Sequence, residues 1–145
     1  MYKNRYFTHI HNFLPFVNKT RFVAHDLKQH NILTHSVLAV AFRFASCHFP
    51  KLFKDSDIYA DNYFRKVMLR LRDPYRARLR HVQAALLMTI YLDMDDTDME
   101  SVQWSTLGKA IRMAQDIGLH RSCSSWNLPA SEIETRNRVF YTCYV

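Results

Sequence analysis

The sequence predicts an all-α protein, a multi-helix array built around antiparallel helical hairpins. Its 145 residues include only 2 glycines and 4 prolines, too few for the positive-φ turns that all-β folds and flexible linkers need. Hydrophobic residues make up 48% of the chain, which excludes disorder by composition. Apolar residues also recur at spacings of three and four in several stretches, as they do along an amphipathic helix.

Two helices are expected in the first part of the chain, after a segment at residues 6–23 that is aromatic but without a period. This segment is expected to form an ordered apolar loop or a short turn of helix. The first helix begins after the N-cap candidate Asn31 and ends before Pro50; its apolar face is Leu33, Val37, Leu38, Ala41, Phe42 and Ala45. The second begins at Ser56 or Asp57 and ends at Asp73, since a residue before proline is disfavoured in helical geometry; it carries Ile58, Tyr59, Tyr63, Val67 and Leu71.

The next two helices are expected over residues 78–92 and 99–117. The former is apolar almost all round, which is typical of a helix in the middle of a bundle. A short acidic loop joins the two, so they should pack as an antiparallel hairpin. The latter should end at Gly118, where a C-cap glycine is expected. Gly108 lies inside it at a cost of about 1 kcal/mol relative to alanine, and close approach of the preceding helix is the expected reason.

A fifth helix is indicated by Pro129 and by Ser131 and Glu134, which have the spacing of a capping box. It carries Ile133, Val139, Phe140 and Tyr144, and its pattern runs up to the last residue, so a longer chain is expected. We expect residues 1–145 to form one partial domain, with a basic segment and two helices in residues 1–80. Residues 81–145 would hold the hairpin and the start of the next helix.

The net charge of +7 is unevenly distributed. Residues 1–80 carry 15 basic and 5 acidic side chains, whereas residues 81–145 carry 5 basic and 8 acidic ones. A cluster of cations that could contact nucleic-acid phosphates consists of Arg65, Lys66, Arg70, Arg72, Arg76, Arg78 and Arg80. Because leucines interleave with these cations, and long arginine stems often cover apolar helix faces, a solvated helix face is the favoured interpretation.

No catalytic, cofactor-binding or metal-binding residues are predicted. The cysteines Cys47, Cys123 and Cys143 lack zinc-site or disulfide-framework spacing and indicate reduced thiols in a cytosolic or nuclear setting. The acidic tract of residues 93–100 fails the glycine and twelfth-position tests of a calcium loop. Histidines at positions 9, 11, 25, 30 and 35 lack the spacing of a helical metal pair. No apolar run is long enough to span a membrane.

Three segments together resemble the fungal-specific transcription factor domain, the middle homology region of fungal binuclear zinc-cluster regulators. The first two are residues 81–92 and, after Trp104, residues 109–121, which read KAIRMAQDIGLHR; the third is residues 134–144, ETRNRVFYTCY. Residues 6–22, with His11 and Pro15, resemble the family's aromatic and proline-containing opening segment more loosely.

The resemblance implies a nuclear, all-α, non-enzymatic domain that regulates transcription by RNA polymerase II through protein partners or the rest of a transcription factor. In the family a six-cysteine cluster with two zinc ions reads DNA, and three scattered cysteines cannot build it. The motif residues Gly108, Gly118, Leu119, His120 and Arg121 are expected to serve as scaffold, the last two near helix C-terminal carbonyls. Two alternatives remain: nucleic-acid binding through residues 65–80, and metabolite sensing in a pocket among the helices at 31–47, 78–92 and 99–117.

Overall fold

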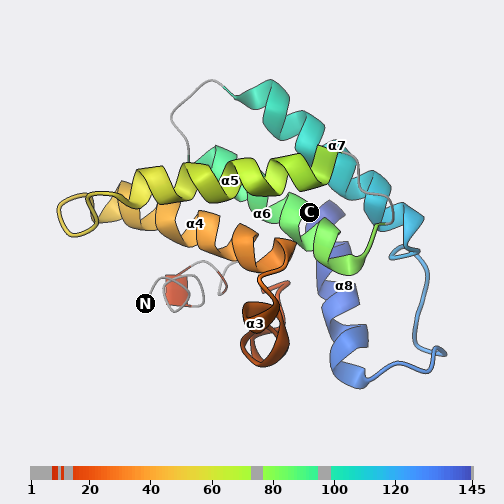
Figure 1. Ribbon diagram of the computed structural model, residues 1–145. Helices are drawn as coiled ribbons and strands as arrows, with labels where there is room; N and C mark the ends of the chain where they lie inside the picture. The colour runs from red at the N-terminus through yellow and green to blue at the C-terminus, as the bar shows by residue number, and fades with distance from the viewer. Residues whose placement is uncertain (1–7, 10, 12–14, 73–76, 95–98, 145) are drawn as a thin grey trace.

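In a computed structural model of the chain, residues 8–9, 11, 15–72, 77–94 and 99–144 are described, and this part contains helices and no strand (Figure 1). The predicted all-α class is therefore confirmed. A short irregular helix comes first, made of α2 (Lys19–Arg21), the π-helical turn η2 (Phe22–Asp26) and α3 (Leu27–Gln29). Five longer helices follow: α4 (Ile32–His48), α5 (Ser56–Arg72), α6 (Leu79–Asp93), α7 (Glu100–Asp116) and α8 (Ala130–Tyr144).

Helices α4 and α5 form the first antiparallel hairpin (Figure 1). The predicted N-cap is confirmed, since Asn31 Oδ1 accepts a hydrogen bond from the Thr34 backbone N–H at 3.1 Å. Asp57 does not cap α5; its carboxylate instead accepts from Arg43 of α4 at 3.0 Å and from the Ser46 hydroxyl. This polar contact ties the beginning of α5 to the second half of α4.

The apolar face predicted for α5 is only partly correct. Val67 and Leu71 are buried, and Tyr63 stacks on Phe42 of α4 with ring centroids 5.8 Å apart. In contrast, Ile58 and Tyr59 are 63% and 52% exposed. The first turns of α5 therefore hold the hairpin through Asp57 together with the buried Ala60 and the contact of Tyr59 with the Phe42 ring.

Helix α6 lies in the middle of the molecule, as its nearly continuous apolar sequence predicts, and packs against α4, α5, α7 and α8. All residues from Val82 to Met88 are buried. Helix α7 packs along α6, which confirms the predicted second hairpin. No described helix is both long and apolar enough to cross a membrane.

The two glycines of the second hairpin have different roles. Gly118 has a φ of +73° and follows the end of α7, as predicted. The close-approach explanation for Gly108 is wrong: the three atoms nearest to a Cβ there all belong to the guanidinium of Arg112, on its own helix, at 3.7–3.9 Å. Helix α6 is therefore not the nearest neighbour of that position.

Helix α8 presents a buried stripe of Thr135, Val139 and Cys143, one residue per turn. It begins at Ala130, one residue before Ser131, so Ser131 is not its N-cap. The carboxylate of Glu134 pairs with Arg138 on the next turn. The predicted capping box is therefore not formed, because Glu134 points along the helix toward Arg138.

Residues 15–29 contain the ordered apolar segment with a short turn of helix that was expected at residues 6–23. Phe16, Val17 and Phe22 are buried in the core, and Gln83 of α6 donates from Nε2 to the Phe16 carbonyl at 2.8 Å. The helical turns at 19–29 end at His30, which has a φ of +48°. A left-handed residue at this position ends the helix as a glycine would.

Candidate functional site

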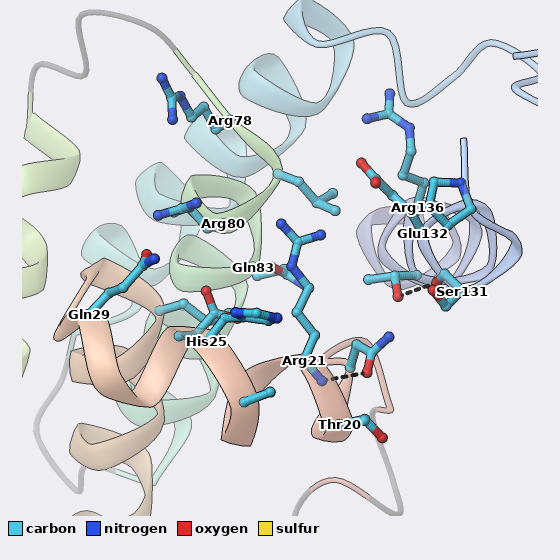
Figure 2. Close-up of a pocket in the computed structure, with 17 residues that line it drawn as sticks. Thr20, Arg21, His25, Gln29, Arg78, Arg80, Gln83, Ser131, Glu132 and Arg136 are labelled. Atoms are coloured by element: carbon cyan, nitrogen blue, oxygen red, sulfur yellow. Dashed lines mark hydrogen bonds between the residues drawn. The ribbon is translucent and has the colours of Figure 1, made fainter. Parts of the chain in front are cut away.

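The described part of the chain contains an open cleft of about 970 Å³. It lies between the helical turns at 19–29 and the beginnings of α6 and α8 (Figure 2). Its charged lining consists of four arginines and two acids: Arg21, Arg78, Arg80, Arg136, Asp26 and Glu132. In Figure 2 Arg78 and Arg80 lie on one side, Arg136 and Glu132 on the other, and Arg21 rises between them.

Local structure places each arginine. Asn18 caps α2 by accepting from the Arg21 backbone N–H at 3.1 Å, so Arg21 lies in the first turn of that segment. Arg78 is the N-cap residue of α6, and Arg80 lies within the first turn of that helix. Arg136 donates to the Ile117 carbonyl at 3.0 Å, and its guanidinium carbon lies 5.1 Å from the Trp126 ring centroid.

The two carboxylates of the cleft have unequal environments. Asp26 is only 7% exposed, and its Oδ1 accepts from the Asn31 side-chain amide at 2.9 Å. Its backbone carbonyl also accepts from the Thr34 hydroxyl. Asp26 therefore holds α4 to the preceding turns, whereas Glu132, in the first turn of α8, is half-buried at the rim.

The electrostatic field at the beginning of α6 is positive. Burial lowers the pKa of His81 below its ordinary value of 6.5, and the charges of Arg80 and Arg78 lower it further. The neutral ring accepts a hydrogen bond at Nδ1 from the Arg78 backbone N–H, at 3.1 Å. His81 thus caps α6 as long as it is not protonated.

The predicted basic cluster is divided by the structure. Arg65, Lys66, Arg70 and Arg72 are exposed on α5 and do not line the cleft. Only Arg78 and Arg80 belong to the cleft, while Arg76 lies outside the described residues. Arg65 pairs with Asp61 one turn earlier at 3.0 Å, which is the contact of an ordinary solvated helix face.

The pocket predicted among the helices at 31–47, 78–92 and 99–117 is not where the cleft lies. Sequence reasoning did not identify Arg21 or Arg136 as members of a site. Arg21 lies in a segment without a helical period, and Arg136 lies on a helix far along the chain. Only the Asn18 cap three residues before Arg21 signals that a helix begins there.

That His120 and Arg121 serve near the carbonyls at the end of α7 stays a prediction. Both side chains are exposed, the Arg121 backbone N–H donates to the Gly118 carbonyl at 3.1 Å, and the Ile117 carbonyl accepts from the Arg136 guanidinium. Leu119, in contrast, is buried, as expected for a residue that packs back on the helix.

Within the described residues, the thiols and histidines do not gather into a metal centre. No three His, Cys, Asp or Glu side chains gather in a metal-binding group in the described part of the chain. The acids at 95, 96 and 98 lie outside that part. The thiol of Cys143 is buried, which raises its pKa to about 11 and makes it unreactive near neutral pH.

The structure is thus an all-α scaffold with an open, charged cleft. The Fungal specific transcription factor domain family matches residues 4–145, and the chain belongs to this family. The recognised segments are thus part of a match that extends over almost the whole chain.

Curated relatives agree with this assignment. Cutinase transcription factor 1 beta of Fusarium vanettenii is 32% identical over 85 residues, or 58% of this chain and 9% of the relative. Nitrogen assimilation transcription factor nit-4 of Neurospora crassa is 32% identical over 119 residues, or 76% of this chain and 11% of the relative. Transcription factor tazR of Aspergillus terreus is 27% identical over 150 residues, or 96% of this chain and 23% of the relative.

The chain is therefore similar to transcription factors of several fungi, and it spans less than a quarter of the length of each of these three. No solved structure matches the chain.

Proposed function

We propose that this chain is the regulatory domain of a nuclear transcription regulator, that it acts on RNA polymerase II genes through protein contacts, and that it is not an enzyme. The observation that carries this proposal is the family match over residues 4–145. The relatives are all named as transcription factors or as a regulatory protein, which supports the same function here.

DNA reading is assigned to a module other than this chain. The family's DNA reader needs six cysteines to hold two zinc ions, and the chain has three. Two of these, Cys123 and Cys143, are buried in the helical core, where they contribute apolar contacts. The cations on α5 are weaker candidates for DNA contact, because Arg70 and Arg72 lie in the last turn, where the helix dipole favours cations, and Arg65 pairs with Asp61.

A reporter assay tests the regulatory role. The chain is inserted between a heterologous DNA-binding domain and an activation domain in a fungal cell, and reporter output is compared with a fusion that carries an unrelated helical domain of the same size. We expect the chain to change the output and the unrelated domain to leave it unchanged. Equal output from the two fusions would contradict a regulatory role.

A mobility-shift assay tests the non-DNA-reading part of the proposal. The purified chain should not shift random duplex DNA at an ionic strength of about 0.15 M. A shift that weakens steeply with salt, and that is lost when Arg65, Lys66, Arg70 and Arg72 are replaced by glutamine, would show direct nucleic-acid binding instead.

A further inference from the structure

The cleft between residues 19–29, α6 and α8 has an excess of positive charge. Four arginines and two acids line it, and one of the acids, Asp26, already accepts a hydrogen bond from Asn31. The guanidinium groups of Arg21 and Arg80 have no hydrogen-bond or ion-pair partner in the described part of the chain. In that part of the chain neither cation is paired with a carboxylate, although both line the cleft.

The position of the cations increases this imbalance. Arg78 and Arg80 lie at the beginning of α6, where the aligned peptide dipoles place a partial positive charge and cations are unfavourable. Burial and then the charges of Arg80 and Arg78 lower the pKa of His81, which accepts from the Arg78 N–H. A negatively charged ligand in the cleft would interact favourably with the guanidinium groups and with the helix end.

We propose that this cleft binds a small molecule that carries at least two negatively charged groups, either carboxylates or phosphates. Guanidinium groups donate paired hydrogen bonds to both kinds of oxyanion. A volume of about 970 Å³ lies within the range of small-molecule sites. Glu132 at the rim supplies an acceptor, so a ligand that also carries a hydroxyl group fits best.

A small ligand fits the cleft better than a nucleic-acid backbone does. The exposed cations Arg65, Lys66, Arg70 and Arg72 lie on α5 and do not line the cleft. The inference goes beyond the regulatory function proposed above and does not depend on it.

Calorimetric titration of the purified chain tests the proposal. Citrate is the carboxylate probe and pyrophosphate the phosphate probe, and both are compared with sodium chloride at the same ionic strength. The Arg21→Gln/Arg80→Gln double variant removes the two unpartnered cations, and Arg70→Gln/Arg72→Gln is the matched control with the same change in charge on α5. We expect at least one probe to bind, the cleft variant to lose about tenfold or more in affinity, and the control to stay within about twofold.

Thermal unfolding without ligand checks that the cleft variant is folded. Its Tm should equal or exceed that of the unmodified chain, because it removes a cation from the beginning of α6.

If both variants lose affinity equally, binding is a general effect of charge and the proposal is wrong. The proposal is also wrong if neither probe binds more strongly than chloride does. Polyglutamate and duplex DNA are titrated as macromolecular anions, and the proposal is wrong if only these bind and their binding depends on Arg21 and Arg80.

Titration and reporter output are separate measurements. If neither probe binds in the titration but the chain still changes reporter output, only the anion-binding inference is wrong. If a probe binds but the chain leaves reporter output unchanged, only the proposed regulatory function is wrong.

Discussion

Gly118 shows how one residue ends a helix and reverses the chain. Its N–H donates to the Gln115 carbonyl at 3.0 Å, and the next N–H, of Leu119, donates to the Ala114 carbonyl at 2.9 Å. These two bonds form a Schellman motif, which satisfies carbonyls at the end of α7. Leu119 is then buried against the core. The motif needs a positive φ at Gly118, which residues with a side chain adopt only at a cost.

Gly118→Val should therefore destabilise the chain by about 2 kcal/mol and lower its Tm by about 5 °C, as measured by thermal denaturation. The cost comes from the backbone angle rather than from crowding, because a Cβ would have ordinary contacts at 3.9 Å. Gly118→Asn should cost less, since asparagine tolerates this conformation. An unchanged Tm for the valine variant would contradict this account.

Gly108→Ala should have the opposite effect. The position is inside α7, and the three atoms nearest to an added Cβ all belong to the flexible Arg112 side chain. Alanine is favoured over glycine in a helix by about 1 kcal/mol, so urea denaturation should show a gain of up to that size. A clear loss of stability would instead restore the predicted close contact with a neighbouring helix.

At the scale of elements, α6 is the helix on which the fold depends most. Leu87 and Met88 are fully buried, and α6 is packed against α4, α5, α7 and α8. A helix covered on all sides has little room to relax around a cavity. Truncation of one of its large side chains should therefore be costly.

Leu87→Ala is expected to lower the free energy of unfolding by about 2–5 kcal/mol, as measured by urea denaturation. Leu69→Ala on α5 is the control, because Leu69 is 67% exposed and exposed positions usually change stability by about 0.5 kcal/mol or less. Similar losses for the two variants would mean that α6 is not the central helix.

The elements also show what local sequence can predict. The ends of α4, α6 and α7 agree with the sequence to within about one residue, because caps, prolines and a C-terminal glycine act locally. The short turn of helix expected within residues 6–23 is present as α2 and the start of η2, whereas the burial of Phe16 depends on α6, which supplies the Gln83 contact. The capping box failed for a similar reason, since Glu134 has Arg138 as an alternative partner.

At the scale of the whole molecule, three half-buried histidines make stability depend on pH. Burial is the largest cause that lowers the pKa of His11, His35 and His81 below 6.5. Neighbouring cations lower the pKa values further, namely Arg138 and Lys19 at His11, and Arg70, Lys66 and His30 at His35. The pKa values of these three histidines are thus lowered at separate places in the fold, first by burial and then by the neighbouring cations of a basic chain.

The unfolded chain binds more protons than the folded chain between the lowered pKa values and 6.5. Stability should therefore be fully present above about pH 6.5 and decrease as the pH falls through the folded pKa values. Denaturation midpoints measured from pH 8 to pH 5 check this. His81→Gln should keep the acceptor for the Arg78 N–H and reduce the slope; an unchanged slope would mean that His81 does not contribute.

The sequence by itself determined the helical class, the helix ends and the family, because these depend on residues that are close together along the chain. Only the tertiary structure decided which charged residues meet. Arg21, Arg80 and Arg136 are far apart in sequence and come together because the turns at 19–29, α6 and α8 pack around one core. The cations of residues 65–80, which form one cluster in sequence, are separated because α5 presents its share to solvent while Arg78 and Arg80 begin the next helix.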